Sequence, residues 1–395
     1  MSRVDDGGRA DVVVVGAGVV GASVAFHLAE AGADVVVLER DEPASGSSGK
    51  PVGGVRAQFS DPLNVTLGAR SLQAYAAFGD RPGADIGLQR VGYLFLLPTE
   101  DDVGLFRASV AVQNALGVPS RLVGLDEAAA LNPWLDTSRY AGAAWCDQDG
   151  WAHPAAVVRG YLDAASRLGA RVRTRTEVTG VRRDGDRVTG VRTTAGTVAT
   201  GTVVCCAGAW SQAVGAMAGV HLPVVPLRRQ IALTGPPPAR GARAPLPFTI
   251  DFGSTYYCHD AADTAVDPGA GLLLGIADPA TRPGPDRSYD EAWLPTLRAA
   301  ARRCTPGLAD LPVRSGWAGL YEMTPDHDAL LGRAAGVEGF LYATGFSGHG
   351  FLQAPAVGEV LRDLVLGVPP PVDVSALHAD RFDGARPVRA EANII

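Results

Sequence analysis

The sequence from Asp11 to Gly21, Asp-Val-Val-Val-Val-Gly-Ala-Gly-Val-Val-Gly, predicts the start of a dinucleotide-binding unit. Its four consecutive valines are typical of a short, buried parallel strand. Gly16, Gly18 and Gly21 follow in the G-x-G-x-x-G pattern, and residues 22–30 have the apolar spacing of a helix. In such a unit the first glycine permits a tight turn and the second lets the backbone approach a pyrophosphate. The third lets helix and strand pack closely.

A second apolar strand, Val35–Leu38, ends at an acidic residue, Glu39. An acid roughly 20 residues after the glycines accepts hydrogen bonds from a ribose 2′-hydroxyl group. It also disfavours a 2′-phosphate, so these residues predict FAD or NAD rather than NADP. A glycine-rich turn without a nucleotide is the alternative, but the order of strand, glycines, helix, strand and acid favours the nucleotide.

The composition is that of a globular protein rather than a disordered one. The chain has 395 residues, 47% of them hydrophobic, which is enough for two or three domains. A formal charge of −7 without a Lys/Arg block makes a nucleic-acid partner unexpected. The first residues are polar and no apolar run is long enough for a membrane span, so we expect a soluble, cytoplasmic protein. The five cysteines show no C-x-x-C or Cys/His ligand spacing, so no metal site is expected.

The segment after the second strand, Pro43–Arg56, is dense in small residues and predicts a loop. Because it follows the second strand of the nucleotide unit, this loop can lie along a cofactor. Arg56 ends the loop, just before a helical pattern at residues 62–78. Taken alone, Arg56 is most simply a surface arginine.

Later segments predict that the nucleotide-binding unit is interrupted twice. Residues 87–149 and 219–316 have the patterns of inserted α+β segments, whereas residues 150–218 and 317–395 continue the first unit.

Within these segments, Phe248–Tyr257 and Gly271–Ile276 are each predicted as one strand, and Asp290–Cys304 as a helix interrupted at Pro295. The tail from Pro369 has few apolar anchors and is expected to be loosely attached.

Three further motifs occur along the chain: Cys206-Ala-Gly-Ala-Trp-Ser211, Gly319-Leu-Tyr-Glu-Met-Thr-Pro-Asp326 and Gly345-Phe-Ser-Gly-His-Gly-Phe351. Together with the N-terminal glycines and Glu39, they make nearly the whole chain resemble the D-amino-acid oxidase superfamily of flavoproteins. The resemblance is to its sarcosine oxidase, glycine oxidase and proline dehydrogenase β-subunit branch in particular.

This resemblance implies an α/β fold with a discontinuous, Rossmann-like FAD-binding domain, residues 1–86, 150–218 and 317–395. An inserted α+β substrate-binding domain, residues 87–149 and 219–316, is expected to be built on a mostly antiparallel sheet that covers the flavin.

The resemblance also implies which residues bind FAD. Ala207 and Gly208 would end a strand beside the pyrophosphate, and the backbone of Val178 would contact the adenine. The loop Ser347–Gly350 would direct N–H groups at the flavin edge where negative charge collects. His349 would add a hydrogen bond there or fill the loop as a structural residue. The full predicted set is Gly16, Gly18, Val19, Val20, Gly21, Glu39, Arg40, Ser47, Ser48, Gly53, Gly54, Val178, Ala207, Gly208, Trp210, Gly345, Ser347, Gly348, His349, Gly350 and Phe351.

For the substrate, Arg56 aligns with an arginine that binds the substrate carboxylate in sarcosine oxidases, where a planar guanidinium suits a bidentate carboxylate. Tyr256, Tyr257 and Tyr321 resemble the tyrosines that line this family's substrate pocket, and with His349 they complete the predicted catalytic set. The alternative for each tyrosine is that it is a buried core residue. At least one of the three is expected to reach the substrate.

The chain departs from its relatives at four positions. Gly319 and Lys50 stand where relatives attach the flavin covalently, so the FAD is expected to be non-covalent. Leu352 replaces a second basic residue for the substrate carboxylate. Leu273 stands where a lysine activates oxygen in sarcosine oxidases, which predicts slow reaction with oxygen, although Lys50 is an alternative source of positive charge.

These observations predict FAD-dependent oxidation of the C–N bond of an amino or imino acid, with hydride transfer to flavin N5 and an imine product. The electron acceptor, O₂ or another, is left open, as are the substrate side chain and the oligomeric state. The alternatives are a flavin-dependent tailoring enzyme of other chemistry, a flavin-carrying subunit of a hetero-oligomeric dehydrogenase, and an NAD dehydrogenase.

Overall fold

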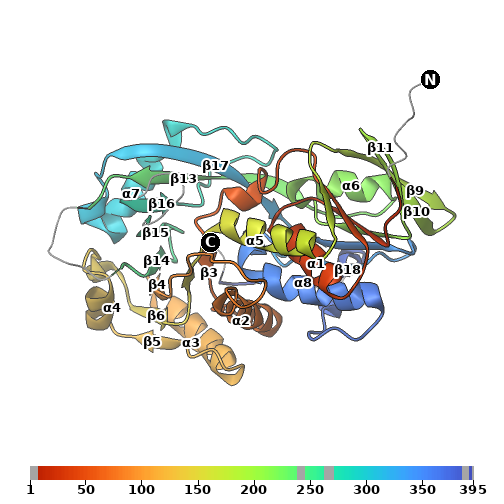
Figure 1. Ribbon diagram of the computed structural model, residues 1–395. Helices are drawn as coiled ribbons and strands as arrows, with labels where there is room; N and C mark the ends of the chain where they lie inside the picture. Colours follow the sequence, from red (N-terminus) through yellow and green to blue (C-terminus); the bar gives the residue numbers. More distant parts are fainter. Residues whose placement is uncertain (1–7, 238–244, 262–270, 385–390, 394–395) are drawn as a thin grey trace.

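A computed structural model describes residues 8–237, 245–261, 271–384 and 391–393 of the chain (Figure 1). The fold is a mixed α/β architecture built around two large sheets, one of six strands and one of eight. The predicted nucleotide-binding strands belong to the first sheet, and most strands of the two predicted insertions belong to the second.

The six-stranded sheet is mostly parallel. Its strand order is β18 (Leu330–Arg333), β19 (Phe340–Thr344), β12 (Thr202–Cys205), β1 (Val12–Val15), β2 (Val35–Leu38) and β8 (Arg171–Arg173). All neighbouring strands run parallel except β18 and β19. The valine run is therefore an interior parallel strand, as predicted.

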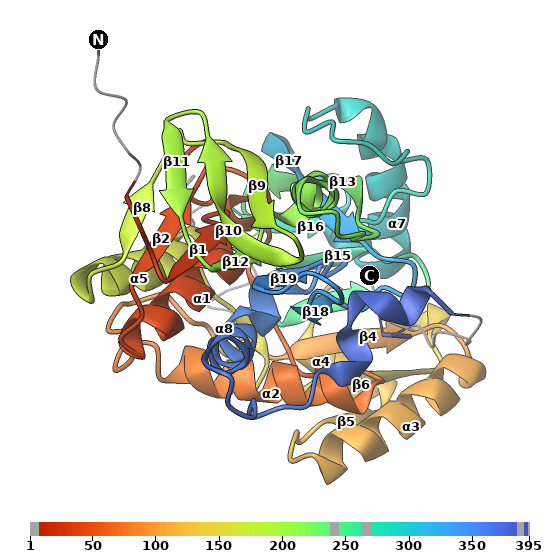
Figure 2. The same ribbon diagram turned by 90° about the vertical axis from the view of Figure 1, so that its right-hand side faces the viewer.

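Side chains alternate between the two faces of β1. Val12 and Val14 belong to a core shared with helices α1 (Val19–Glu30), α5 (Pro154–Arg167) and α8 (Gly350–Leu366), against which α2 (Pro62–Ala76) also packs. Val13 and Val15 belong to a second core, shared with a three-stranded sheet of β9 (Val178–Asp184), β10 (Arg187–Thr193) and β11 (Gly196–Ala199). Figure 2 shows this small sheet above the six strands, with α1 and α8 below them. Burial on both faces explains why the valine run is unbroken by polar residues.

The eight-stranded sheet is mostly antiparallel. Its order is β17 (Val313–Met323), β13 (Val225–Thr234), β16 (Leu272–Gly275), β15 (Tyr257–Asp260), β14 (Phe248–Asp251), β4 (Tyr93–Leu97), β6 (Gly142–Cys146) and β5 (Arg121–Val123). Only β4 and β14 pair in parallel. The expected boundary at residue 317 falls inside β17, which pairs with β13 over its length. Helices α4 (Leu125–Leu131) and α7 (Leu294–Cys304) cover one face, and α3 (Glu100–Ala115) packs near β4, β5 and β6.

The prediction of one strand over Phe248–Tyr257 is wrong, because this segment turns back on itself. Strands β14 and β15 pair antiparallel around the turn, and Asp251 accepts hydrogen bonds from the Ser254 hydroxyl and from the Gly253 N–H, the latter at 3.2 Å. Thr255 has a φ of +62°. Asp, Gly and Ser are the residues that stabilise such turns, and this signal outweighs the apolar pattern around it. The turn reverses the chain just before Tyr256 and Tyr257.

Two helices begin earlier than the apolar pattern indicated. Helix α1 begins at Val19 rather than at residue 22, and α8 begins at Gly350 rather than at Gln353. Both therefore start directly at their glycine loops, so their free N–H groups lie beside the loops. Likewise, Pro295 does not interrupt its helix but occupies the first turn of α7, after a short 3₁₀ helix.

The remaining elements are short and connect the larger ones. They are β3 (Gly54–Val55) paired with β7 (Gly150–Trp151), helix α6 (Ser211–Met217), and the 3₁₀ helices η1 (Ser47–Gly49), η2 (Thr137–Arg139), η3 (Gly208–Trp210), η4 (Glu291–Trp293), η5 (Pro306–Leu308), η6 (Ser375–Leu377) and η7 (Ala379–Phe382).

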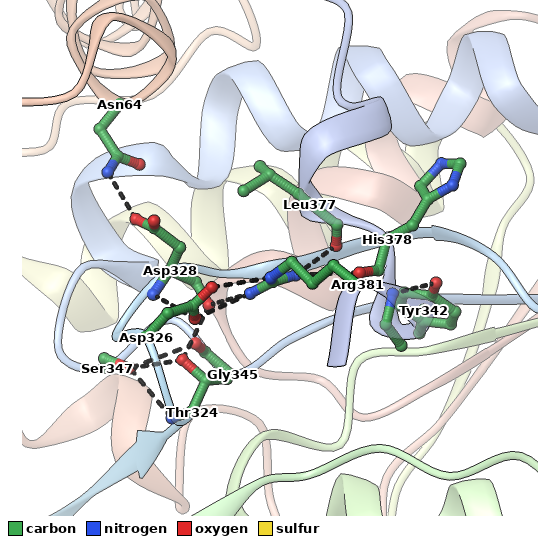
Figure 3. Close-up of polar contacts among 11 residues, drawn as sticks. Asn64, Thr324, Asp326, Asp328, Tyr342, Gly345, Ser347, Leu377, His378 and Arg381 are labelled. Atoms are coloured by element: carbon green, nitrogen blue, oxygen red, sulfur yellow. Dashed lines mark hydrogen bonds and ion pairs between the residues drawn. The ribbon is translucent and has the colours of Figure 1, made fainter. Parts of the chain in front are cut away.

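The C-terminal segment is attached more firmly than its sequence predicted. Arg381, in η7, forms a two-pronged ion pair with Asp326, at 2.8 and 2.9 Å, and also donates to the carbonyl of Asp328 at 3.0 Å (Figure 3). Thr324 donates to the same carbonyl at 2.8 Å, and the Thr324 N–H donates to the Ser347 hydroxyl at 3.2 Å. The expectation of a loose tail is wrong for residues 375–382, because a buried carboxylate holds this segment next to the loop before α8.

In the part of the chain that the structure describes, no helix is long and apolar enough to cross a membrane. The same residues contain no group of three or more His, Cys, Asp or Glu side chains arranged to hold a metal ion.

Candidate active site

A cavity of about 300 Å³ is lined by residues from both large sheets. One wall consists of the glycine loop before α1, the end of β2, the loop before η1 and the start of α8. The other wall consists of residues from β13, β15 and β17. The cavity therefore lies where the predicted cofactor unit meets the large antiparallel sheet.

The glycine loop has the shape that a bound pyrophosphate requires. Gly16 has a φ of +106°, and a Cβ at this position would lie 2.4 Å from the carbonyl oxygen of Cys206. A Cβ on Gly21 would lie 2.0 Å from the carbonyl oxygen of Gly16, and one on Gly18 would lie 2.9 Å from the Ser48 hydroxyl. Side chains are thus excluded from the glycine positions, and the N–H of Val19 at the start of α1 donates to the Ser48 hydroxyl at 2.8 Å. The loop, the helix start and Ser48 together form a surface that suits a phosphate.

The carboxylate of Glu39 is fixed at the edge of the cavity. One oxygen accepts from the N–H of Ala17 at 2.8 Å, and the other accepts from the N–H of Asp41 at 2.8 Å. Each oxygen keeps further lone pairs. The site therefore fits an adenosine ribose, and the residues along the cavity fit FAD.

Most of the predicted FAD residues line this cavity. They are Gly16, Gly18, Val19, Val20, Glu39, Arg40, Ser47, Ser48, Gly54, Val178, Ala207, Gly208, Trp210, Gly348, His349, Gly350 and Phe351. The other four, Gly21, Gly53, Gly345 and Ser347, lie behind it and shape the loops. Ser347 is one example: it is buried, has a φ of +50°, and is held by the Thr324 N–H.

The guanidinium of Arg56 lies at the cavity but is otherwise enclosed by protein. Arg56 is only 2% exposed and follows β3 directly. It donates to the carbonyl of Gln58 and, at 2.7 Å, to the carbonyl of Asn393. Its guanidinium carbon lies 4.2 Å from the ring centre of Phe59 and 5.4 Å from that of Phe95. No ion pair to Arg56 occurs within the described ranges, so its charge faces the cavity without a carboxylate partner.

The imidazole of His349 contacts the guanidinium of Arg56 as a neutral group. Burial, reinforced by the charge of Arg56, lowers the pKa of His349 to about 3, so its imidazole is neutral at pH 7. Its Nε2 lies 3.4 Å from an Arg56 nitrogen and accepts from it if the proton is assigned to Nδ1. The His349 ring also packs edge-on against Phe59, with centroids 5.0 Å apart. His349 thus helps to orient the guanidinium.

The end of the chain adds another support for Arg56. Glu391 is buried and accepts from the N–H and hydroxyl of Ser60, at 2.7 and 2.6 Å, and from Asn64 at 3.0 Å. This contact places the carbonyl of Asn393 against Arg56. The sequence offers no signal for it, because more than 300 residues separate the partners.

The three predicted tyrosines do not share one location. Tyr257 and Tyr321 line the cavity, whereas Tyr256 is buried in the core beneath α7, with its hydroxyl 2.9 Å from that of Thr305. Consecutive residues of a strand face opposite sides, so only one of Tyr256 and Tyr257 can reach the cavity. Burial raises the pKa of Tyr257 and Tyr321, so both phenols are protonated donors at neutral pH.

Glycines leave room for both cavity tyrosines. The Tyr257 ring lies over Gly275, where a Cβ would be 2.1 Å from the phenol oxygen. The Tyr321 ring lies over Gly348, where a Cβ would be 2.6 Å from the ring. The contact between Tyr321 and Gly348 places β17 against the loop before α8, so the two walls of the cavity meet there.

Several polar cavity residues were not among the site residues predicted from the sequence, and four of them bear on the chemistry. They are Lys50, Tyr93, Arg229 and Glu322. Glu322 accepts from the N–H of Gly345 at 3.0 Å and from the Thr344 hydroxyl at 2.8 Å, and burial raises its pKa. The pair Arg228-Arg229 in a strand was a usable signal for Arg229, because strand alternation points one of two neighbouring arginines inward.

Leu273 is placed differently from its expected position over the flavin. It does not line the cavity, and it packs in a small core with Ile231, Leu233 and Trp317. Lys50 does line the cavity, next to Gly319: a Cβ on Gly319 would lie 2.8 Å from the Cβ of Lys50. The two predicted positions of covalent attachment are therefore neighbours.

We predict that FAD is released intact when the protein is denatured. Neither Gly319 nor Lys50 has a side chain of the kind that attaches the flavin in the family, and these two residues form the wall where such a bond would lie. Acid precipitation should leave the yellow colour in the supernatant. A washed pellet that keeps its flavin would contradict this prediction and point to another attachment residue.

Comparisons with known proteins identify the family of this chain. The family model for FAD-dependent oxidoreductases of the DAO type matches residues 11–364. FAD-dependent oxidoreductase domain-containing protein 1 of Bos taurus is 30% identical, over 91% of this chain and 81% of that protein. The crystal structure of L-proline dehydrogenase from P. horikoshii superposes with a TM-score of 0.88 at 32% identity, covering 95% of this chain and 98% of that one.

A third relative is longer than this chain. The 4-methylaminobutanoate oxidase (formaldehyde-forming) of Paenarthrobacter nicotinovorans is 28% identical over 94% of this chain, which spans only 45% of that protein. The family match spans the glycine loop, whose close contacts exclude side chains at Gly16, Gly18 and Gly21. This chain belongs to the DAO family of FAD-dependent oxidoreductases.

Proposed function

We propose that this protein oxidises the C–N bond of an amino or imino acid that binds through its carboxylate to Arg56. The observation behind the proposal is a guanidinium that is only 2% exposed, lies at the cavity, and has neutral carbonyls and a neutral imidazole as its partners. The buried carboxyl groups of Glu391 and Asp149 attract this guanidinium without forming an ion pair with it within the described residues. An anionic ligand in the cavity would supply the direct ion pair and stabilise the buried charge.

Bound FAD would supply the chemistry, because its isoalloxazine ring accepts a hydride. The glycine loop, Glu39 and the residues at the start of α8 would hold it. The chain's own residues then bind and orient the substrate. Arg56 would position the carboxylate, and Tyr257 and Tyr321 would enclose the rest as neutral donors. Their orientation of the reacting C–H bond is the main catalytic contribution of the protein.

A dedicated general base is not needed for this reaction, and the cavity wall around Arg56 does not offer an obvious one. His349 is neutral and occupied with Arg56, and Glu322 already accepts two hydrogen bonds from the α8 loop. The substrate amine would therefore bind in its neutral form, and the imine would be hydrolysed by water.

Similarity to named proteins supports this class of substrate. One structure is titled an L-proline dehydrogenase and one relative is named a 4-methylaminobutanoate oxidase. Proline and 4-methylaminobutanoate both contain an amine and a carboxylate. The partial match to the longer relative keeps a second possibility open, in which this chain is the flavin-carrying subunit of a larger assembly.

The test is anaerobic mixing of the purified yellow protein with D-, L- and N-methyl amino acids and proline. We expect at least one of them to bleach the flavin absorbance band, without any assumption about the electron acceptor. Consumption of NADH or NADPH with no bleaching by any amino acid would instead support a tailoring enzyme of other chemistry.

A further inference from the structure

A second guanidinium, that of Arg229, lines the cavity opposite the cofactor loops. Arg229 is half-buried in β13, and the next residue on the same face, Ile231, also lines the cavity. Within the described residues its Nε is buried and has no hydrogen-bond partner. Its Nη1 reaches only the carbonyl of Arg228, at 3.3 Å, and no ion pair to Arg229 occurs in that part of the chain. The guanidinium thus has donors to spare.

Strand pairing explains why Arg229 points into the cavity. In the β13–β17 register Arg229 lies opposite Gly319, which has no side chain, and Leu227 lies opposite Tyr321. Diagonal neighbours on one face are within reach of a long side chain. The Arg229 guanidinium accordingly lies 5.3 Å from the ring centre of Tyr321. A Cβ on Gly319 would lie 2.8 Å from the Cβ of Lys50, so the missing side chain leaves room for Lys50 beside the same strand pair.

Both arginines act on Tyr321. The charges of Arg229 and Arg56 both act on its phenol, and both lower its pKa against the larger effect of burial. Lys50 adds a third cationic side chain to the same cavity. The cavity is also lined by Glu39, Asp41, Glu177 and Glu322, but Glu39 accepts hydrogen bonds at the glycine loop and Glu322 accepts them from residues before α8. The cationic groups near Tyr321 therefore favour a ligand with more than one negative charge on that side of the cavity.

We infer that Arg229 binds a second anionic group of the substrate, so that the preferred substrate is an amino or imino acid with an additional carboxylate. This inference rests on the proposed function. Arg56 would bind the carboxylate next to the reacting carbon, and Arg229 would bind the distal one through its free Nε and a second N–H. A planar guanidinium with unpaired donors matches a carboxylate in two-pronged geometry.

Arg228 provides a matched control on the same strand. It precedes Arg229, does not line the cavity, and forms an ion pair with Asp286 at 2.8 Å. Arg228→Met removes one positive charge from β13 and leaves the cavity wall intact. Any effect of net charge alone would therefore appear in both Arg228→Met and Arg229→Met.

The experiment measures binding of unreactive carboxylates to the FAD-loaded protein by calorimetry and by the shift of the flavin absorbance band. Propionate and butyrate report on one carboxylate, and succinate and glutarate report on two. We expect a dicarboxylate to bind roughly ten- to a hundredfold more tightly than the matched monocarboxylate, because its second carboxylate adds one charge-assisted hydrogen-bonded pair. Arg229→Met should abolish this preference and leave monocarboxylate affinity within about twofold. Arg229→Lys should restore part of it, and Arg228→Met should keep it.

Three results would overturn the inference. The first is a parent protein without a dicarboxylate preference. The second is equal weakening of both ligand classes by Arg229→Met, which would mean that the two arginines share one carboxylate. The third is loss of FAD from the variant, which would make Arg229 a cofactor ligand. Failure of the proposed function would look different, because no amino acid would then bleach the flavin, whatever the carboxylate preference.

Discussion

Arg56→Met lowers kcat/KM for the best amino-acid substrate by roughly one to two orders of magnitude. A charge-assisted hydrogen-bonded pair contributes about 1.5–3 kcal/mol, and each 1.36 kcal/mol corresponds to a factor of ten. The sequence predicts that Leu352 replaces a second basic residue, so Arg56 would bind the carboxylate next to the reacting carbon alone. Steady-state kinetics of the FAD-loaded variant provide the measurement.

The controls separate lost binding from lost structure. Arg56→Lys should recover only part of the activity, because an ammonium cannot make the two parallel bonds of a guanidinium. Flavin content should stay largely unchanged, because the glycine cradle and Glu39 do not contact Arg56, whose partners include the carbonyl of Asn393 and the ring of His349. Binding of propionate, followed by calorimetry, should weaken in parallel with kcat/KM. Full activity in Arg56→Met would show that the carboxylate binds elsewhere.

Lys50→Met slows reoxidation of the reduced flavin by oxygen by at least an order of magnitude. Oxygen becomes an anion when it takes the first electron, and a nearby cation stabilises that charge. Two unit charges about 8 Å apart at an effective dielectric of about 20 interact by roughly 2 kcal/mol, or about thirtyfold in rate. Lys50 lines the cavity, whereas Leu273 does not line it and belongs to an apolar cluster with Ile231, which does. Stopped-flow mixing of reduced protein with air-saturated buffer measures the rate.

The positions of Lys50 and Leu273 change the reason for expecting slow reaction of the reduced flavin with oxygen. Slow oxidation was predicted because an apolar Leu273 was expected to face the flavin, and the structure removes that argument. Leu273→Met, which conserves side-chain volume, should therefore leave the reoxidation rate unchanged. If the parent protein reoxidises slowly and Lys50→Met makes no difference, Lys50 has no part in the reaction, and a dye or quinone is the better acceptor to test.

Local signals were sufficient for the cofactor half of the molecule. The valine run, the glycines and Glu39 lie within 30 residues of one another, and each acts through its own backbone or through the next turn of chain. The glycine cradle, the buried parallel strand and Glu39 could therefore be inferred without knowledge of distant contacts, whereas the predicted FAD residues from Val178 onward came from the family resemblance.

The substrate half depended on tertiary structure. The turn at Asp251 reverses the chain before Tyr257, and in a strand a shift of one residue exchanges the two faces. The sequence alone consequently could not decide between Tyr256 and Tyr257. Nor could it show that Leu273 does not line the cavity or that Arg229 lies against Tyr321. Arg56 itself was identified from its motif, but its burial against Asn393, 337 residues away in sequence, follows only from how the chain ends pack together. Local sequence thus determined the glycine loop and the acid that bind the cofactor. Pairing between distant strands decided which side chains face the substrate, because side chains alternate between the two faces of a strand and the sequence does not say which face lines the cavity.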